Sequence, residues 1–150
     1  MKAFNIEAEN SMSIVDAFNK LGNEFAVDSA DLGDGLSVSA STLAVAGNDL
    51  NESLALLTGG TEITQDANAM GNALRVISLR VRGMKGELQE LNEETEGLES
   101  ISKIQTQILN LTGNRVNIFD SNNNFRSTYD ILQDISKETL IKSETEYQTV

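Results

Sequence analysis

The sequence contains no cysteine, histidine, tryptophan or proline. Without cysteine, the chain can form neither a disulfide bond nor a thiolate metal site. The absence of both histidine and cysteine also excludes the common pairs of nucleophile and general base, and the usual sets of zinc ligands. We therefore expect a protein that is not an enzyme, binds no cofactor and acts through its surfaces.

Long apolar runs are absent as well. No stretch approaches the roughly 18 apolar residues that form a membrane-spanning helix. The N-terminal stretch MKAFNIEAEN contains one lysine and no apolar core, so we do not expect a signal peptide. A chain of 150 residues with a mean hydropathy of −0.23 is long and apolar enough for one modest hydrophobic core.

Acidic residues outnumber basic ones and give the chain a formal net charge of −12. The excess is uneven, because residues 1–74 carry −9, residues 87–99 carry −6 and residues 100–150 carry −1, whereas residues 75–86 carry +4. An acidic surface repels phosphate groups, so we expect no sequence-specific nucleic-acid partner.

Apolar residues recur at helical spacing along most of the chain, which predicts a mainly α protein. The predicted helices cover about 11–26, 29–46, 48–58, 66–91, 101–112 and 127–142. Suitable N-cap residues precede several of them, namely Ser29, Asn48 or Asp49, Asp66 and Ser127. Glycines mark the predicted helix ends at Gly47, at Gly59 and Gly60, and at Gly113.

The helical spacing of apolar residues ends near residues 115–126. There the stretch RVNIFD, a polar SNNN turn and the stretch FRS predict one small β-hairpin. Asp120, Asn122 and Asn124 have the spacing of a calcium loop. However, Phe125 and Ile131 stand where that loop needs glycine and glutamate, so an asparagine-rich turn is the preferred interpretation. We expect a single domain of about five to six helices over residues 1–142, followed by a frayed tail over 143–150.

A heptad pattern runs through the predicted helix at 66–91. Its residues are Met70, Leu74, Ile77, Val81, Met84, Leu88 and Leu91, which alternate spacings of four and three. We call this set the seam and predict that it packs against other helices of the domain or of sister copies. Gly83 and Gly86 lie off the seam and each costs about 1 kcal/mol in a helix interior, so they indicate a hinge or a close neighbour.

The four basic residues of this stretch flank the seam. They are Arg75, Arg80, Arg82 and Lys85. Three interpretations remain open, namely pairing with acidic faces, binding to a membrane surface and binding to nucleic acid. Pairing is the simplest, because the charges spread around the helix and no aromatic residue lies among them.

Two stretches resemble the phage tail tape measure family. The first covers residues 25–88 and overlaps MGNALRVISLRVRGMKGELQE at 70–90, and the second is IFDSNNNFRSTYDILQDIS at 118–136. They occur in the order found in that family, and the resemblance covers roughly residues 4–136. The sequence is therefore similar to the core segment of tape measure proteins of long-tailed phages and prophages.

The resemblance implies a structural role in the phage tail. Tape measure proteins occupy the lumen of the tail tube, and their length sets the length of the tail. From this we expect self-association and binding to tail tube or tail assembly chaperone proteins, in the virion tail lumen and, during assembly, in the host cytoplasm. The alternative is a membrane-active segment that aids DNA passage through the host envelope at ejection, with transient membrane contact at infection.

The sequence also departs from the family pattern. Tape measure proteins are many hundreds of residues long, so we expect these 150 residues to be a fragment. KETLIKSETEYQTV replaces a tryptophan-containing continuation, which leaves the packing of the last helix open, and Ala67 stands where the family often has proline.

Overall fold

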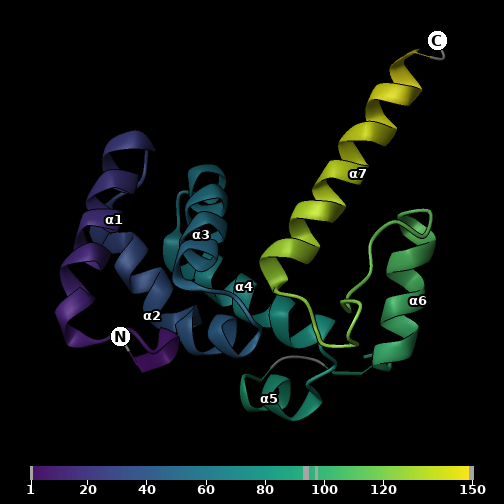
Figure 1. Cartoon of the computed structure of the whole chain (residues 1–150), viewed down its shortest axis with the longest axis horizontal. Coiled ribbons are helices and arrows are strands. Elements are labelled where there is room, and N and C mark those ends of the chain that lie inside the picture. Colours follow the sequence, from purple (N-terminus) through teal and green to yellow (C-terminus); the bar gives the residue numbers. More distant parts are fainter. Residues whose placement is uncertain (1, 93–94, 97, 149–150) are drawn as a thin grey trace. The chain divides into compact units, whose positions relative to one another are not determined.

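The computed structural model describes residues 2–92, 95–96 and 98–148, and over these the chain is mainly helical, as predicted (Figure 1). The α-helices are α1 (Ser11–Glu24), α2 (Ser29–Val45), α3 (Leu50–Thr64), α4 (Ala67–Val81), α5 (Lys85–Glu90), α6 (Ile101–Leu111) and α7 (Thr128–Gln148), and two short 3-10 helices, η1 (Lys2–Phe4) and η2 (Ala8–Asn10), precede them. None of the helices in the described part of the chain combines the length and hydrophobicity needed to cross a bilayer.

The chain forms two compact units, Met1–Ser78 and Leu79–Val150, whose boundary falls inside α4. Each unit is described on its own below. The expectation of a single domain over residues 1–142 with a frayed tail stays a prediction. Helix α7 continues to Gln148, and residues 149–150 lie outside the described residues.

The first unit is built around α2, which contacts α1, α3 and η1. Leucines at helical spacing on α2 meet leucines of α3 and α4 in one hydrophobic core. The buried core residues are Val27, Leu32, Leu36, Ala40, Leu43, Leu54, Leu57 and Leu74. Burial of these side chains contributes the main stabilising term, at about 1.5–3 kcal/mol for each large one.

Side-chain caps begin α2, α3 and α4 of this unit, whereas α1 has none. Asp49 and Glu52 form a capping box on α3, in which each side chain accepts a hydrogen bond from the other residue's backbone N–H, at 2.8 and 2.9 Å. Asp66 caps α4. At α2 the N-cap is Asp28 rather than the predicted Ser29, because the Asp28 carboxylate accepts the N–H groups of the first turn.

The predicted end of α3 at Gly59 and Gly60 is wrong. The helix continues to Thr64 and ends at Gln65, which takes the left-handed conformation with φ 55°. Gly60 has a packing role instead, because a Cβ atom there would clash with the side chain of Met70. The absence of a side chain at Gly60 therefore makes room for α4.

The second unit has a small core of its own. Its fully or nearly buried hydrophobic residues are Leu79, Leu88, Val116, Ile118 and Ile131. Helices α6 and α7 begin where predicted, with Ser127 accepting a hydrogen bond from the backbone of α7 at 3.1 Å. Gly113 follows the end of α6 with φ 63°, as predicted for a terminating glycine.

The predicted β-hairpin is reduced to a single antiparallel bridge between Phe119 and Phe125, with no strand in the described residues. Alternate residues of this segment are buried, as a strand would require, since Val116 and Ile118 are both fully buried. Their backbone N–H groups, however, donate to the side chains of Thr112 and Gln105, at 3.2 and 2.8 Å. Side chains of α6 and its C-cap thus take the place of a partner strand.

Candidate interaction site

The seam lies on two helices rather than one. Met70, Leu74, Ile77 and Val81 belong to α4, Leu88 belongs to α5, and Met84 and Leu91 flank α5. Leu74 is 1% exposed in the first unit and Leu88 is 0% exposed in the second, while the other five are half-buried. Much of the seam is therefore used for packing inside each unit, and its contact with sister copies stays a prediction.

The prediction of one helix through residue 91 is wrong, because Gly83 ends α4. Gly83 has φ 63°, its N–H donates to the carbonyl of Arg80, and the N–H of Met84 donates to the carbonyl of Leu79, both at 3.0 Å. This pattern is a Schellman motif, in which a left-handed glycine satisfies the last carbonyls of a helix. A Cβ at Gly83 would also lie 3.1 Å from Ile101, so it is both a turn residue and a close-contact residue.

Arg82 lies over the ring of Phe125, with 4.8 Å between its guanidinium carbon and the ring centroid. Phe125 in turn contacts Phe119, at 4.7 Å between ring centroids. Desolvation by burial lowers the pKa of Arg82 from its ordinary value. This cation–π contact holds Arg82 against Phe125 of its own unit.

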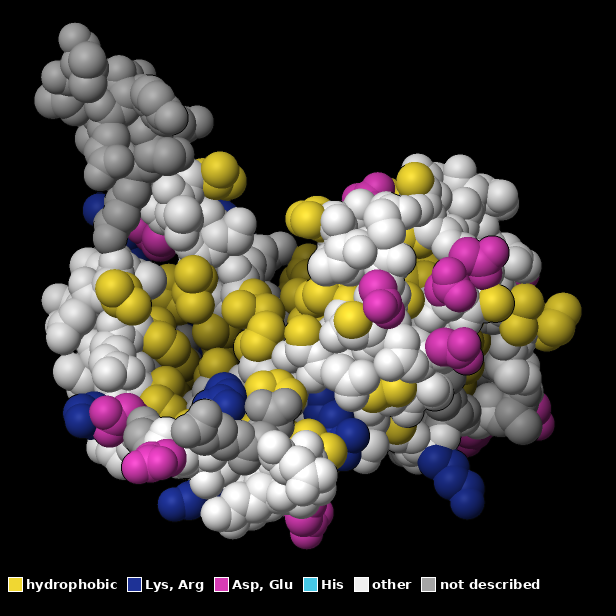
Figure 2. Space-filling model, turned by 180° about the vertical axis from the view of Figure 1, so that it is seen from behind, with side chains coloured by type: hydrophobic (Ala, Val, Ile, Leu, Met, Phe, Trp, Pro, Cys, Tyr) yellow, Lys and Arg dark blue, Asp and Glu magenta, His cyan; other side chains and the backbone are white. Residues whose placement is uncertain are grey.

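The other basic residues of this stretch do not form one exposed basic face. Arg75 and Arg80 are half-buried, and Lys85 is exposed. Figure 2 shows lysine and arginine side chains next to hydrophobic and uncharged ones on the face that it draws. Pairing of the four residues with acidic faces stays a prediction.

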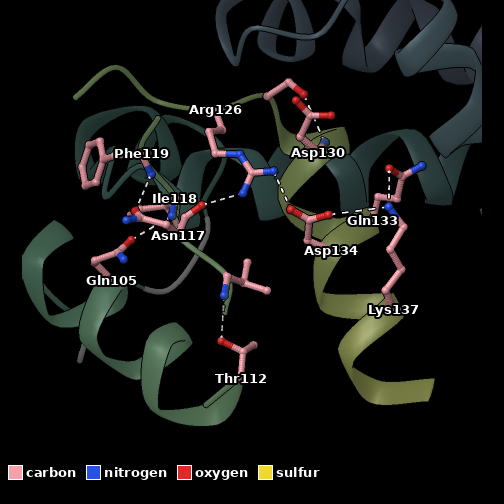
Figure 3. A network of polar contacts seen from close by, with 12 residues as sticks. Gln105, Thr112, Asn117, Ile118, Phe119, Arg126, Asp130, Gln133, Asp134 and Lys137 are labelled. Carbon is pink, nitrogen blue, oxygen red and sulfur yellow. Dashed lines mark hydrogen bonds and ion pairs between the residues drawn. The ribbon is translucent and has the colours of Figure 1, made fainter. Parts of the chain in front are cut away.

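A polar network fastens the segment before α7, as Figure 3 shows. Arg126 donates to the carbonyl of Asn117 at 2.9 Å and to the carboxylate of Asp134 at 2.6 Å. Lys137 lies 3.7 Å from the other carboxylate oxygen. The hydrogen bond from Arg126 is the main reason that the pKa of Asp134 lies below its ordinary value. The network fixes the irregular chain against the first turns of α7.

Sequence reasoning missed the contacts of Arg82 and Arg126. The partner of Arg82 is an aromatic residue more than forty positions away, and no periodic pattern joins them. Arg126 and Asp134 are separated by the N-terminus of α7, so they do not share the helical spacing that signals an ion pair. The one available signal is that Arg126 lies two residues after the polar turn and directly before the Ser127 cap.

The polar turn at residues 120–124 is the asparagine-rich turn that the sequence favours. The Asp120 carboxylate accepts the backbone N–H groups of Asn122 and Asn124, at 2.8 and 2.9 Å. Asn123 adopts φ 63°. The hydrogen bond from Asn124 is the largest cause that lowers the pKa of Asp120. Over the described stretches, no group of three or more acidic side chains could hold a metal ion.

Comparison with known proteins supplies the remaining observation. The sequence matches the family described as phage-related minor tail protein over residues 1–149. The match includes both units and all the helices described above. No solved structure matches this chain.

Proposed function

Since the chain belongs to the phage-related minor tail protein family, we propose that it helps to set tail length and to assemble the tail tube. A structural role in the tail of the virion follows from the membership itself. The finer proposal is that it works as part of a tape measure, without enzymatic chemistry and through packing of its helices against other proteins.

The observation that carries this proposal is the extent of the family match together with the order of two tape-measure-like stretches. The match covers 1–149, and the stretches at 25–88 and 118–136 both lie within it. The absence of histidine and cysteine supports a role without catalysis, because the common nucleophile–base pairs need one or the other.

We propose the tail tube protein, the tail assembly chaperones and sister copies of this chain as partners. The proposed location is the lumen of the tail tube, after assembly in the host cytoplasm. The strongly negative first unit, with a formal charge of −8 over residues 1–78, supports contact with basic protein surfaces rather than with DNA. Partners of this kind bury helical faces, as the helices of each unit already do.

Protease treatment of purified tails tests this location. In intact tails we expect the chain to be present by mass spectrometry and resistant to an added protease, because the tube wall excludes the enzyme. After the tube is dissociated, the chain should be cut at the same rate as the isolated protein. Absence from purified virions, or rapid cleavage in intact tails, would contradict a place in the lumen.

A further inference from the structure

The heptad spacing of the seam continues backwards along the chain, beyond Met70. Four residues precede Met70 at alternating spacings of three and four, namely Ala67, Ile63, Gly60 and Leu56. This longer series runs through Gln65 and Asp66, the two residues that separate α3 from α4. One continuous helix is the simplest structure with such a pattern.

Ile63 is the member of this series that the separate helices do not explain. Its side chain is 86% exposed, more than that of any other large hydrophobic residue in the described part of the chain. Ala67 and Leu74, by contrast, are buried. A single exposed isoleucine is common on protein surfaces, but this one also holds a position in the heptad register. Two separate helices account for the buried members of the series and leave Ile63 without a role.

The break between α3 and α4 depends on a left-handed residue that is not glycine. Gln65 ends α3 with φ 55° and ψ 24°. Left-handed glycines follow α2, α4 and α6 instead, at Gly47, Gly83 and Gly113. Glutamine is a good helix former and is strained where φ is positive. The residue at this break therefore favours a helical backbone more than the residues at the other three breaks do.

The hydrogen bonds that hold this turn are local. The Gln65 side-chain amide donates to the carbonyl of Glu62 at 2.8 Å, and the Asp66 carboxylate accepts the N–H of Ala69 at 2.9 Å. Backbone hydrogen bonds of a helix replace such contacts within one turn. The chain also contains no proline, so no residue of the turn forbids an α-helix.

From these observations we propose a second conformation, in which α3 and α4 join into one helix over Leu50–Val81. The two connecting residues then take helical backbone angles, and Ile63 lies on one stripe with Ala67 and Met70. The joined helix is about 48 Å long, at about 1.5 Å per residue. The inference concerns a property of the isolated chain, goes beyond the proposed function and does not depend on it.

Contacts of α4 within the first unit decide which conformation is more populated. Leu74 is 1% exposed in the core, and Met70 occupies the space that Gly60 leaves free. Both contacts are lost when the helices join, because Met70 and Gly60 are then about 15 Å apart along the axis. The isolated native chain therefore holds mainly separate helices, and the joined helix is a minor state that changes at the turn can populate.

The distance between two spin labels tests the inference on the full chain. The sequence has no cysteine, so Ala55→Cys and Ala73→Cys, both at exposed positions, can be labelled specifically. In a joined helix the two labels lie about 27 Å apart and on the same side, because their spacing is close to five turns. The native chain should give mainly a shorter distance, since the contact of Met70 with Gly60 holds the helices together.

Changes at the turn should shift this distance in opposite directions. Gln65→Ala combined with Asp66→Ala favours the joined helix, because alanine is the best helix former and cannot cap α4. Gln65→Gly favours the break, because glycine takes the left-handed conformation without strain. The fraction of chains at the long distance should rise about tenfold or more from the glycine variant to the double alanine variant. Circular dichroism should show no loss of helix in the double alanine variant.

Gly59→Ala is the matched control, because Gly59 is an exposed residue of α3 where an added Cβ meets nothing within 4 Å. It raises helix propensity away from the turn and should leave the distances unchanged. Absence of the long distance in the double alanine variant would overturn the inference. A broad distribution with loss of helix would overturn it as well, because α4 would then unfold rather than join α3.

Discussion

Gly35 of α2 and Gly71 of α4 bring the backbones of their helices into direct contact. A Cβ atom on Gly71 would clash with the carbonyl oxygen of Gly35, and one on Gly35 would clash with the carbonyl oxygen of Ala67. Both glycines are buried. The two helices therefore cross at a distance that only residues without a side chain allow, and this crossing positions Leu74 in the core of the first unit.

Gly71→Ala should destabilise the first unit by about 1–3 kcal/mol, because the added methyl group meets backbone that cannot rotate away. Gly33→Ala is the matched control, since Gly33 lies on the same helix as Gly35 and a Cβ there meets nothing within 4 Å. The control should gain up to about 1 kcal/mol from helix propensity. Urea unfolding curves measure both, and equal effects of the two changes would contradict the close crossing.

Gly83→Ala should lower stability by about 1–2 kcal/mol, because alanine is strained in the left-handed conformation that ends α4. If α4 and α5 were one continuous helix, the same change would instead raise stability by about 1 kcal/mol. Gly86→Ala, in the open first turn of α5, should be neutral or slightly stabilising. The sign of the Gly83 effect in thermal unfolding therefore decides between a broken and a continuous seam.

The ion pair of Asp134 predicts a pH-dependent stability. The folded-state pKa of Asp134 lies below its model-peptide value of 3.8, so its contribution is present above about pH 4 and is lost as pH falls through the lower folded pKa. Since its side chain is 35% exposed, solvent screening limits the contribution to about 1 kcal/mol or less.

The free energy of unfolding of the native chain and of Asp134→Asn, measured between pH 2 and pH 6, tests this directly. The difference should be largest near pH 6 and should shrink below about pH 4. Asp16→Asn, an exposed position on α1, serves as the control and should show no comparable difference. A difference for Asp134→Asn that does not change with pH would rule out the assigned ion pair.

The sequence predicts helix starts better than helix ends. Asp49, Asp66 and Ser127 could be identified because a capping residue acts within one turn, so the signal is local. Glycine is ambiguous, because it ends a helix at Gly83 but makes room for Met70 at Gly60. Only the packed structure distinguishes the two uses.

The heptad pattern was misleading for a related reason. Spacings of three and four place residues on one side of a single helix. The same spacing is also compatible with two successive helices, each of which buries part of the series. Leu74 and Leu88 are buried in different units, which a pattern along one sequence cannot show.

Tail length is the most direct measure of the central claim. In a phage whose tail contains this chain, an in-frame duplication of its 150 residues should lengthen the tail by as much as about 225 Å, at about 1.5 Å per helical residue. Duplication of the second unit alone should add about half as much. Electron micrographs in which both duplications leave tail length unchanged, in tails that assemble and contain the longer chain, would contradict a role in setting length.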